Sequence, residues 1–290
     1  MKVNKFRFDG SQQFKIKDAD TKIKDIYEDS NDYEVQIAGL RAELDALQSV
    51  MYAHGRYSLL VIVQAMDAAG KDSTIKGVFS GVNPAGVSMT AFKRPSETEL
   101  AHDYMWRHLL ELPERGQIKV FNRSYYEEVL IVKVHDSILT DVQQLPTELT
   151  ENIDNVFKNR LEDMANFEKF LYRNGTRVVK FFLHVSKEVQ AKRLIERIKD
   201  PTKNWKFQEG DVKERERWED YQNAYQTAIG ATATEKAPWY VIPADDKKNM
   251  RLLMAKALVE TLQDMKMSYP DSSAERKTEL EKLIKVIEKQ

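Results

Sequence analysis

The chain has 290 residues, of which 42% are hydrophobic, so its length fits one large α/β domain with a substantial core. It contains no cysteine, which excludes disulfides and thiolate metal sites and favours the reducing cytosol. A formal net charge of −1 argues against a general affinity for nucleic acid, and no apolar run is long enough for a signal peptide or a membrane span. We therefore expect a cytoplasmic protein without nucleic-acid or membrane partners, in which any polyanion site is local.

The first 54 residues predict a polar arm followed by a long amphipathic helix. Residues 1–30 are mixed and polar, with scattered apolar anchors: Phe6, Phe8, Phe14 and Ile16. The apolar residues that follow recur at helical spacing on one face: Ile37, Leu40, Leu44, Leu47 and Met51. We expect the arm to lie on the domain and the helix to precede the first strand.

Short continuous apolar runs alternate with segments of helical period along the rest of the chain. The run from Leu59 to Val63 has the pattern of a strand buried on both faces of a parallel sheet. Similar runs follow at 87–92, 118–121, 178–185 and 239–242, and Ser96 with Glu99 forms a capping-box pattern between two of them. This alternation predicts a doubly wound α/β fold with a parallel five-stranded sheet.

The second half of the chain is expected to be largely helical. Residues 147–174 are predicted as one helix ending at Gly175, and 187–230 as helices broken at Pro201 and Gly210. Ser272 and Glu275 predict a capping box for a last helix with an apolar stripe at Leu280, Leu283, Ile284 and Ile287. We expect that helix to pack on its own domain or on a neighbouring subunit. The predicted division is 1–54 for arm and helix, 55–266 for the core with a helical lid at about 187–215, and 267–290 for the C-terminal helix.

A phosphate-binding loop is predicted directly after the first strand. The segment from Gln64 to Thr74 joins that strand to a helix, and it supplies the small residues and the lysine that such a loop requires: Ala65, Ala68, Ala69, Gly70 and Lys71. Ala65 replaces the usual first glycine, and Asp72 replaces the usual magnesium-binding Ser or Thr. Asp67 is therefore the candidate metal ligand, while Ser73 and Lys76 are further phosphate-binding candidates. The alternative is a plain junction with a helix-dipole aspartate and a solvated lysine.

Two other strand ends carry candidate residues. Asn122 stands where P-loop enzymes usually place an aspartate, Arg123 could offset charge on a transferring phosphoryl group, and Glu127 could bind metal or nucleotide. The alternative is a helix N-terminus with favourable glutamates. Lys93 and Arg94 follow the second strand and are candidates for phosphate contact, with a solvated turn as the alternative.

A basic stretch interleaved with aromatic residues predicts a mobile lid. Its candidate residues for the nucleotide are Arg193, Arg197, Lys203, Trp205 and Lys206. A solvated helix face is the alternative. Five histidines lack metal-ligand spacing and are assigned no function: His54, His102, His108, His135 and His184.

Together these motifs resemble the polyphosphate kinase 2 family over about residues 52–253. The matching stretches are 66–72, 80–84, 112–116, 122–127, 166–169, 237–240 and 243–245. The resemblance implies a fold similar to thymidylate kinase, with Asp67 and Lys71 as the Walker A residues, Arg123 as the Walker B arginine, and lid arginines at Arg193 and Arg197. Much of the family has Asp at the position of Asn122 and Asn at that of Glu127; the form found here resembles the subgroup that acts on both AMP and ADP.

The resemblance also implies an activity and its requirements. The chain is expected to transfer the terminal phosphoryl group of inorganic polyphosphate reversibly to AMP or ADP, with Mg²⁺ or a substituting Mn²⁺, as a homo-oligomer of two or four subunits. The loop would then grip polyphosphate, Mg²⁺ would bridge to the nucleotide through Asp67 with Asn122 or Glu127 as alternative ligands, and the nucleotide would lie beneath the lid. Two alternatives stay open: an ATP-dependent nucleoside monophosphate kinase, and a nucleotide-sensing interaction module, although the module's Asn-Lys-x-Asp motif is absent.

Overall fold

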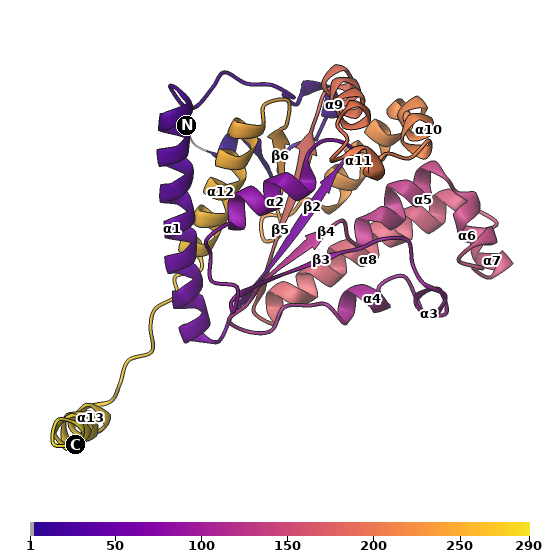
Figure 1. The fold of residues 1–290 in the computed structure, drawn as a ribbon. Helices are drawn as coiled ribbons and strands as arrows, with labels where there is room; N and C mark the ends of the chain where they lie inside the picture. Colours follow the sequence, from indigo (N-terminus) through magenta and orange to yellow (C-terminus); the bar gives the residue numbers. More distant parts are fainter. Residues whose placement is uncertain (1–2) are drawn as a thin grey trace.

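The computed structural model describes residues 3–290 and has an α/β architecture with one mostly parallel sheet (Figure 1). The strand order is β1-β6-β5-β2-β4-β3. The strands are β1 (Arg7–Phe8), β2 (Ser58–Ala65), β3 (Val87–Ala91), β4 (Ile118–Asn122), β5 (Thr176–His184) and β6 (Trp239–Pro243). The five predicted parallel strands are confirmed. The short β1 was not expected; it comes from the N-terminal arm and pairs antiparallel with the edge strand β6.

The sheet is covered on both faces by helices that bury its apolar side chains. Helices α1 (Ser30–His54), α2 (Lys71–Phe79) and α12 (Lys247–Asp264) pack together on one face. Helices α8 (Ile153–Arg173) and α11 (Trp218–Thr232) cover the other (Figure 1). Every residue of β2 and β6 is buried, as expected for strands with both faces covered.

The register of the central strands brings their carboxyl ends to one edge of the sheet. In the parallel pairs of β2, Val63 lies opposite Asn122 of β4 and Ala65 opposite Leu183 of β5. The loops that follow β2 and β4 therefore start side by side, at the edge where doubly wound sheets bind their ligands.

The other helices of the core lie in the segments that connect these elements. They are η1 (Val3–Phe6), η2 (Ile16–Asp18), α3 (Glu97–Leu100), α4 (Trp106–Leu109), η3 (Tyr125–Val129), α5 (Ile131–Val134), α6 (Ser137–Asp141), α7 (Thr147–Thr150), α9 (Lys187–Lys199), η4 (Asn204–Lys206) and α10 (Gly210–Glu216). The predicted Ser96 capping box is present, although the helix it opens has only four residues. The single helix predicted for 147–174 is wrong: Asn152 caps a new helix, α8, after the four-residue α7.

The C-terminal helix α13 (Ala274–Ile287) projects away from the rest of the molecule (Figure 1). The predicted capping box at Ser272 is wrong by one residue, because the hydroxyl of Ser273 accepts from the backbone N–H of Arg276 and the helix begins at Ala274. None of its residues is buried, so the apolar stripe does not pack on its own domain. Packing on a neighbouring subunit, the other expectation, stays a prediction.

The arm does lie on the domain as predicted, with Phe6, Phe14 and Ile16 buried in the core. Within residues 3–290, no helix has the length and apolar character needed to cross a membrane.

Candidate active site

The loop between β2 and α2 has the geometry of a phosphate cradle. Ala68 and Gly70 have φ values of 59° and 106°, in the left-handed region, which turns the chain tightly between strand and helix. The hydroxyls of Ser73 and Thr74 donate to the carbonyl of Gly70 at 3.0 and 2.9 Å and hold the start of α2. The first N–H groups of this helix lack helical partners, so its N-terminus favours an anion.

Lys71 is the first residue of α2 and folds back over the loop. Its Nζ donates to the carbonyl of Ala65 at 2.9 Å. Burial, and secondly the nearby charge of Arg123, lower the pKa of Lys71 from 10.5 to about 8, although Asp67 and Glu127 favour its charged form. The loop lysine is thus close to losing its proton when no polyanion is bound.

Arg123 lies between two carboxylates. It follows β4 in a left-handed conformation, with a φ of 66°. Its Nη2 donates to Asp67 Oδ1 at 2.9 Å and its Nη1 to Glu127 Oε2 at 3.1 Å. Glu127, and after it Asp67, raise the pKa of Arg123, so the guanidinium stays charged at any working pH. The three predicted residues Asp67, Arg123 and Glu127 therefore form one ion cluster.

Asn122 and Asp72, two of the departures from the usual P-loop pattern, contact each other. Asn122 Nδ2 donates to Asp72 Oδ1 at 2.8 Å and so links the end of β4 to the start of α2. Within residues 3–290, no three His, Asp or Glu side chains are grouped so that they could hold a metal ion by themselves. Mg²⁺ commonly binds one or two carboxylates together with substrate phosphates and water. Asp67 at the cradle fits that mode.

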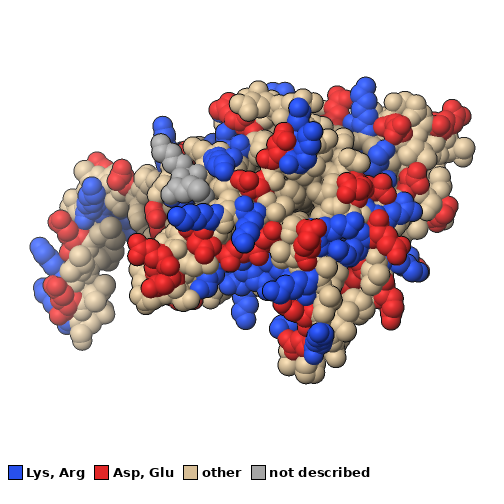
Figure 2. Space-filling view, turned by 90° about the horizontal axis from the view of Figure 1, so that it is seen from above, with Lys and Arg blue, Asp and Glu red and all other residues tan. Residues whose placement is uncertain are grey.

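A cleft of about 520 Å³ opens over the loop; we call it the basic cleft. Its basic side chains are Lys71, Lys93, Arg123, Arg193, Arg197, Lys203, Lys206 and Lys247, and its acidic side chains are Asp67, Asp72, Glu196 and Asp200. The excess of positive charge is local, because Figure 2 shows acidic and basic side chains interspersed over this face of the molecule. The structure thus brings most of the predicted phosphate-binding residues together in one cleft.

Some predicted residues have another contact or lie outside the basic cleft. Arg193 donates to the backbone carbonyls of Ala69, Ala244 and Asp245, at 2.8 to 3.0 Å, so it fastens α9 to the loop. Ala69 itself is fully buried beneath the loop. The side chains that line the basic cleft do not include Lys76, Arg94 or Trp205, and Trp205 is 73% exposed.

A second, narrower cleft of about 30 Å³ lies on the other side of Asp67 and Arg123; we call it the acidic cleft. It is lined by Glu127, Leu130, Ile131, Gln190, Asp211, Glu214, Tyr221 and Tyr225, besides residues of the loop. Burial, and the charge of Asp67, raise the pKa of Asp211, and an ion pair of 3.4 Å joins Asp211 to Arg197 of α9. Gln190 Nε2 donates to the carbonyl of Asp67 at 3.1 Å.

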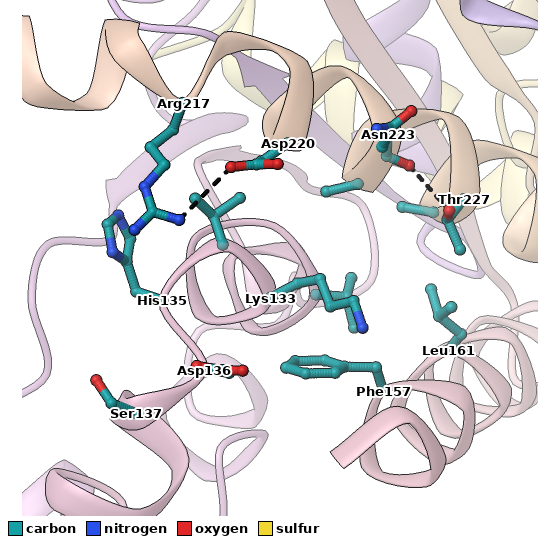
Figure 3. A pocket seen from close by; sticks show the side chains of 14 residues that line it. Lys133, His135, Asp136, Ser137, Phe157, Leu161, Arg217, Asp220, Asn223 and Thr227 are labelled. Atoms are coloured by element: carbon teal, nitrogen blue, oxygen red, sulfur yellow. Dashed lines mark hydrogen bonds and ion pairs between the residues drawn. The ribbon is translucent and has the colours of Figure 1, made fainter.

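The acidic cleft adjoins a larger cavity of about 470 Å³ (Figure 3). His135 lines this cavity, and its Nε2 lies 2.9 Å from Oε2 of Glu214, which lines the acidic cleft. Figure 3 shows Arg217, Asp220, Asn223 and Thr227 along α11, Phe157 and Leu161 on α8, and Lys133 between them. The Nζ of Lys133 lies 4.5 Å from the centre of the Phe157 ring. The cavity thus combines an apolar wall with a rim of hydrogen-bonding groups.

Sequence reasoning missed several of these residues. Lys247 follows the last strand and the Pro-Ala-Asp-Asp segment that caps α12, so its place at a strand's carboxyl end was an available signal. Gln190, Asp211 and Glu214 carry no local signal, because only the tertiary packing of α9 and α10 brings them to the loop. His135 is likewise placed by its contact with Glu214 rather than by any spacing.

Known proteins of one family resemble this chain over nearly all of its length. The family model for polyphosphate kinase 2 matches residues 27–270. A protein of Rhodopseudomonas palustris named ADP-polyphosphate phosphotransferase is 45% identical over 284 residues, which cover 97% of this chain and 96% of the relative. A protein of Meiothermus ruber named AMP/ADP-polyphosphate phosphotransferase is 41% identical over 269 residues, covering 92% and 96%.

Solved structures give the same result. The crystal structure of a polyphosphate kinase 2 from Arthrobacter aurescens superposes with a TM-score of 0.85 at 34% identity, covering 98% of this chain and 96% of that one.

Proposed function

The chain belongs to the polyphosphate kinase 2 family of polyphosphate-dependent nucleotide kinases, and we propose that it transfers the terminal phosphoryl group of inorganic polyphosphate to ADP and to AMP. The observation that carries this proposal is the meeting of the basic cleft and the acidic cleft at the Asp67–Arg123 ion pair. Each cleft suits one of the two substrates, and the pair lies where their phosphates would meet.

The basic cleft suits the polyphosphate chain. Its lysines and arginines come from α2, α9, η4, α12 and the loops after β3 and β4, so a flexible polyanion could contact several of them at once. Lys71 and the N-terminus of α2 would hold the phosphoryl group that is transferred. The lid residues Arg197, Lys203 and Lys206 would extend the path along the chain.

The acidic cleft suits a nucleotide and disfavours a second polyphosphate. Glu127, Asp211 and Glu214 would repel a chain of phosphates. The same carboxylates can accept hydrogen bonds from ribose and base, and the Tyr221 hydroxyl can donate one. With a volume of about 30 Å³, this cleft is too small for a whole nucleoside. We therefore place the base in the adjoining cavity behind His135, whose apolar wall and polar rim are typical of small-molecule sites.

In this arrangement an oxygen of the nucleotide's terminal phosphate attacks the terminal phosphorus of polyphosphate. The P–O bond to the rest of the polyphosphate breaks, and the shortened chain leaves with the bonding electrons. Lys71 and Arg123 would neutralise the charge that spreads over the transferring group, and Asp67 would orient the acceptor or take a proton from it. Mg²⁺ held by Asp67, with Asn122 or Glu127 as alternative ligands, would supply further charge neutralisation. We also propose that the protein works as a homo-oligomer, which the exposed apolar stripe of α13 supports.

The decisive experiment is a product assay with purified protein, Mg²⁺ and no ATP. Incubation of AMP or ADP with polyphosphate should yield ADP and ATP while the polyphosphate shortens, and chelation by EDTA should abolish both changes. Formation of ADP from AMP and ATP, with no reaction of polyphosphate, would instead indicate an ATP-dependent nucleoside monophosphate kinase. Binding of nucleotide without any turnover would indicate a sensing module.

A further inference from the structure

A completely buried ion pair lies beneath the active site, on the face of the sheet covered by α8. Glu168 of α8 and Lys180 of β5 are 1% and 0% exposed, and the Lys180 Nζ donates to Glu168 Oε2. The other carboxylate oxygen accepts from the hydroxyls of Tyr125, at 3.0 Å, and Tyr126, at 2.8 Å. Lys180 also donates to the carbonyl of Thr232 at 2.8 Å. The pair is therefore fully hydrogen-bonded on both sides.

Such a pair is poorly explained by stability alone. Burial raises the pKa of Glu168 and lowers that of Lys180, which means that removal from water opposes both charges. Apolar side chains of similar volume can fill a core at least as favourably as a buried ion pair. A carboxylate that binds two tyrosine hydroxyls does, however, fix where those tyrosines lie.

The two tyrosines hold one end of a strained segment of the active site. Arg123 has a positive φ of 66°, a conformation that a residue with a long side chain keeps only when its surroundings enforce it. On one side, the Arg123 N–H donates to the carbonyl of Val63 in β2 at 3.1 Å. On the other side, Ser124 leads directly into Tyr125 and Tyr126, the first residues of η3.

We propose that Glu168 and Lys180 are positioning residues for Arg123. Acting through the hydroxyls of Tyr125 and Tyr126, they hold η3 so that the Arg123 guanidinium lies between Asp67 and Glu127 in advance of the reaction. Neither residue contacts a substrate. The same pair explains why a glutamate stands at position 168 in a helix face that is otherwise packed in the core.

The positioning of the Arg123 guanidinium does not depend on which phosphoryl donor the enzyme uses. If polyphosphate proved inactive and ATP active, the experiment below would be run with ATP, and its outcome would remain informative. A failure of the proposed function and a failure of this inference are thus separate results.

The test removes the two hydroxyls and keeps the rings, in the variant Tyr125→Phe/Tyr126→Phe. We expect kcat to fall at least tenfold, while KM for polyphosphate and for ADP changes less than twofold, because the guanidinium is misplaced while the other side chains that line the two clefts are unchanged. Glu168→Gln, which keeps the shape of the side chain, should show the same division between kcat and KM. The matched control is Tyr104→Phe, since the Tyr104 hydroxyl is also buried but has no hydrogen-bond partner.

A double-mutant cycle with Arg123→Lys separates positioning from a general loss of stability. In the Arg123→Lys background, the same two Phe substitutions should lower kcat less than twofold, because no guanidinium remains to be positioned. An equal loss of kcat in both backgrounds, or an unchanged kcat with a lowered Tm, would overturn the proposal. If the double Phe variant fails to fold, Tyr125→Phe alone leaves Glu168 with two partners and allows the same cycle.

Discussion

The basic cleft and the acidic cleft share the Asp67–Arg123 ion pair but differ in size, charge and construction. The basic cleft is wide, and eight of the side chains that line it are lysines or arginines. The acidic cleft is narrow, and its carboxylates lie among tyrosines that belong to the core. In our proposal, the first cleft binds a flexible chain of like charges, whereas the second holds part of one nucleotide.

This difference shows how a chain with a net charge of −1 can handle a polyanion. Positive charge is concentrated on one side of the ion pair and negative charge on the other, so their sum stays close to zero. The electrostatic field inside each cleft depends on the nearest side chains rather than on the net charge. A substitution in one cleft alone should therefore change the KM of one substrate and leave the KM of the other unchanged.

The largest effect is expected where both clefts meet. Lys71→Ala and Asp67→Ala should each lower kcat by a factor on the order of 10² to 10³, because each removes a charge from the position of the transferring group. Tm should change little, since neither side chain belongs to the core. Steady-state assays with polyphosphate and ADP, together with thermal unfolding, measure both quantities. Lys158→Ala on the exposed face of α8 is the control, and near-normal turnover of either cleft variant would refute the assignment.

A pH dependence should distinguish the basic cleft from the rest of the site. The pKa of Lys71 is lowered to about 8, so the free protein loses this charge as the pH rises through 8, while binding a polyanion requires it. The Kd for tripolyphosphate, measured by calorimetry without nucleotide, should rise by up to about tenfold per pH unit above pH 8.

The variant Lys71→Arg is the control for this titration. Its guanidinium keeps its charge throughout the range, so the remaining slope reports only the titration of tripolyphosphate itself. Equal slopes in the wild-type protein and in the variant would show that Lys71 does not lose its proton near pH 8.

The proposed site of the base is tested by filling the cavity of about 470 Å³ that His135 lines. Ala224 lines this cavity from α11, and Ala224→Phe should raise KM for ADP about tenfold by excluding the base, with KM for polyphosphate unchanged. Ala231→Phe, at an exposed position of the same helix, is the matched control. Unchanged KM values for both substrates would place the nucleoside elsewhere.

The elements of the fold were predictable where one short-range signal decided them. The run from Leu59 to Val63 could only be a buried strand, and Gly70-Lys71 after it placed the loop and its helix. The break between α7 and α8 was missed because Asn152 competes as a helix cap within a segment that otherwise has helical period. The strand β1 was missed because two residues give no periodicity, and only pairing with β6 defines them.

The candidate site was predictable to the same degree and for the same reason. Asp67, Lys71 and Arg123 lie within a few residues of a strand end, so topology alone brings them together. The acidic cleft needed the tertiary structure, because two of its carboxylates, Asp211 and Glu214, come from α10 and its tyrosines from α11, about ninety to a hundred residues after Arg123. Lys76 is close in sequence to the loop, and Arg94 is close to a strand end, which predicts phosphate contact for both. Neither residue lines the basic cleft.

The smallest effect we predict is also the most selective. Lys247 lies at the rim of the basic cleft, and Lys247→Ala should raise KM for polyphosphate by only about threefold, the size expected for one partly exposed charge. The effect should shrink as ionic strength rises, while KM for ADP stays constant. Lys248→Ala is the control, because the Lys248 Nζ instead donates to Ser30 Oγ at 2.7 Å. Lys247→Ala should thus raise only the KM for polyphosphate, and Ala224→Phe only the KM for ADP. If each variant raised both KM values, the two clefts would bind a single substrate.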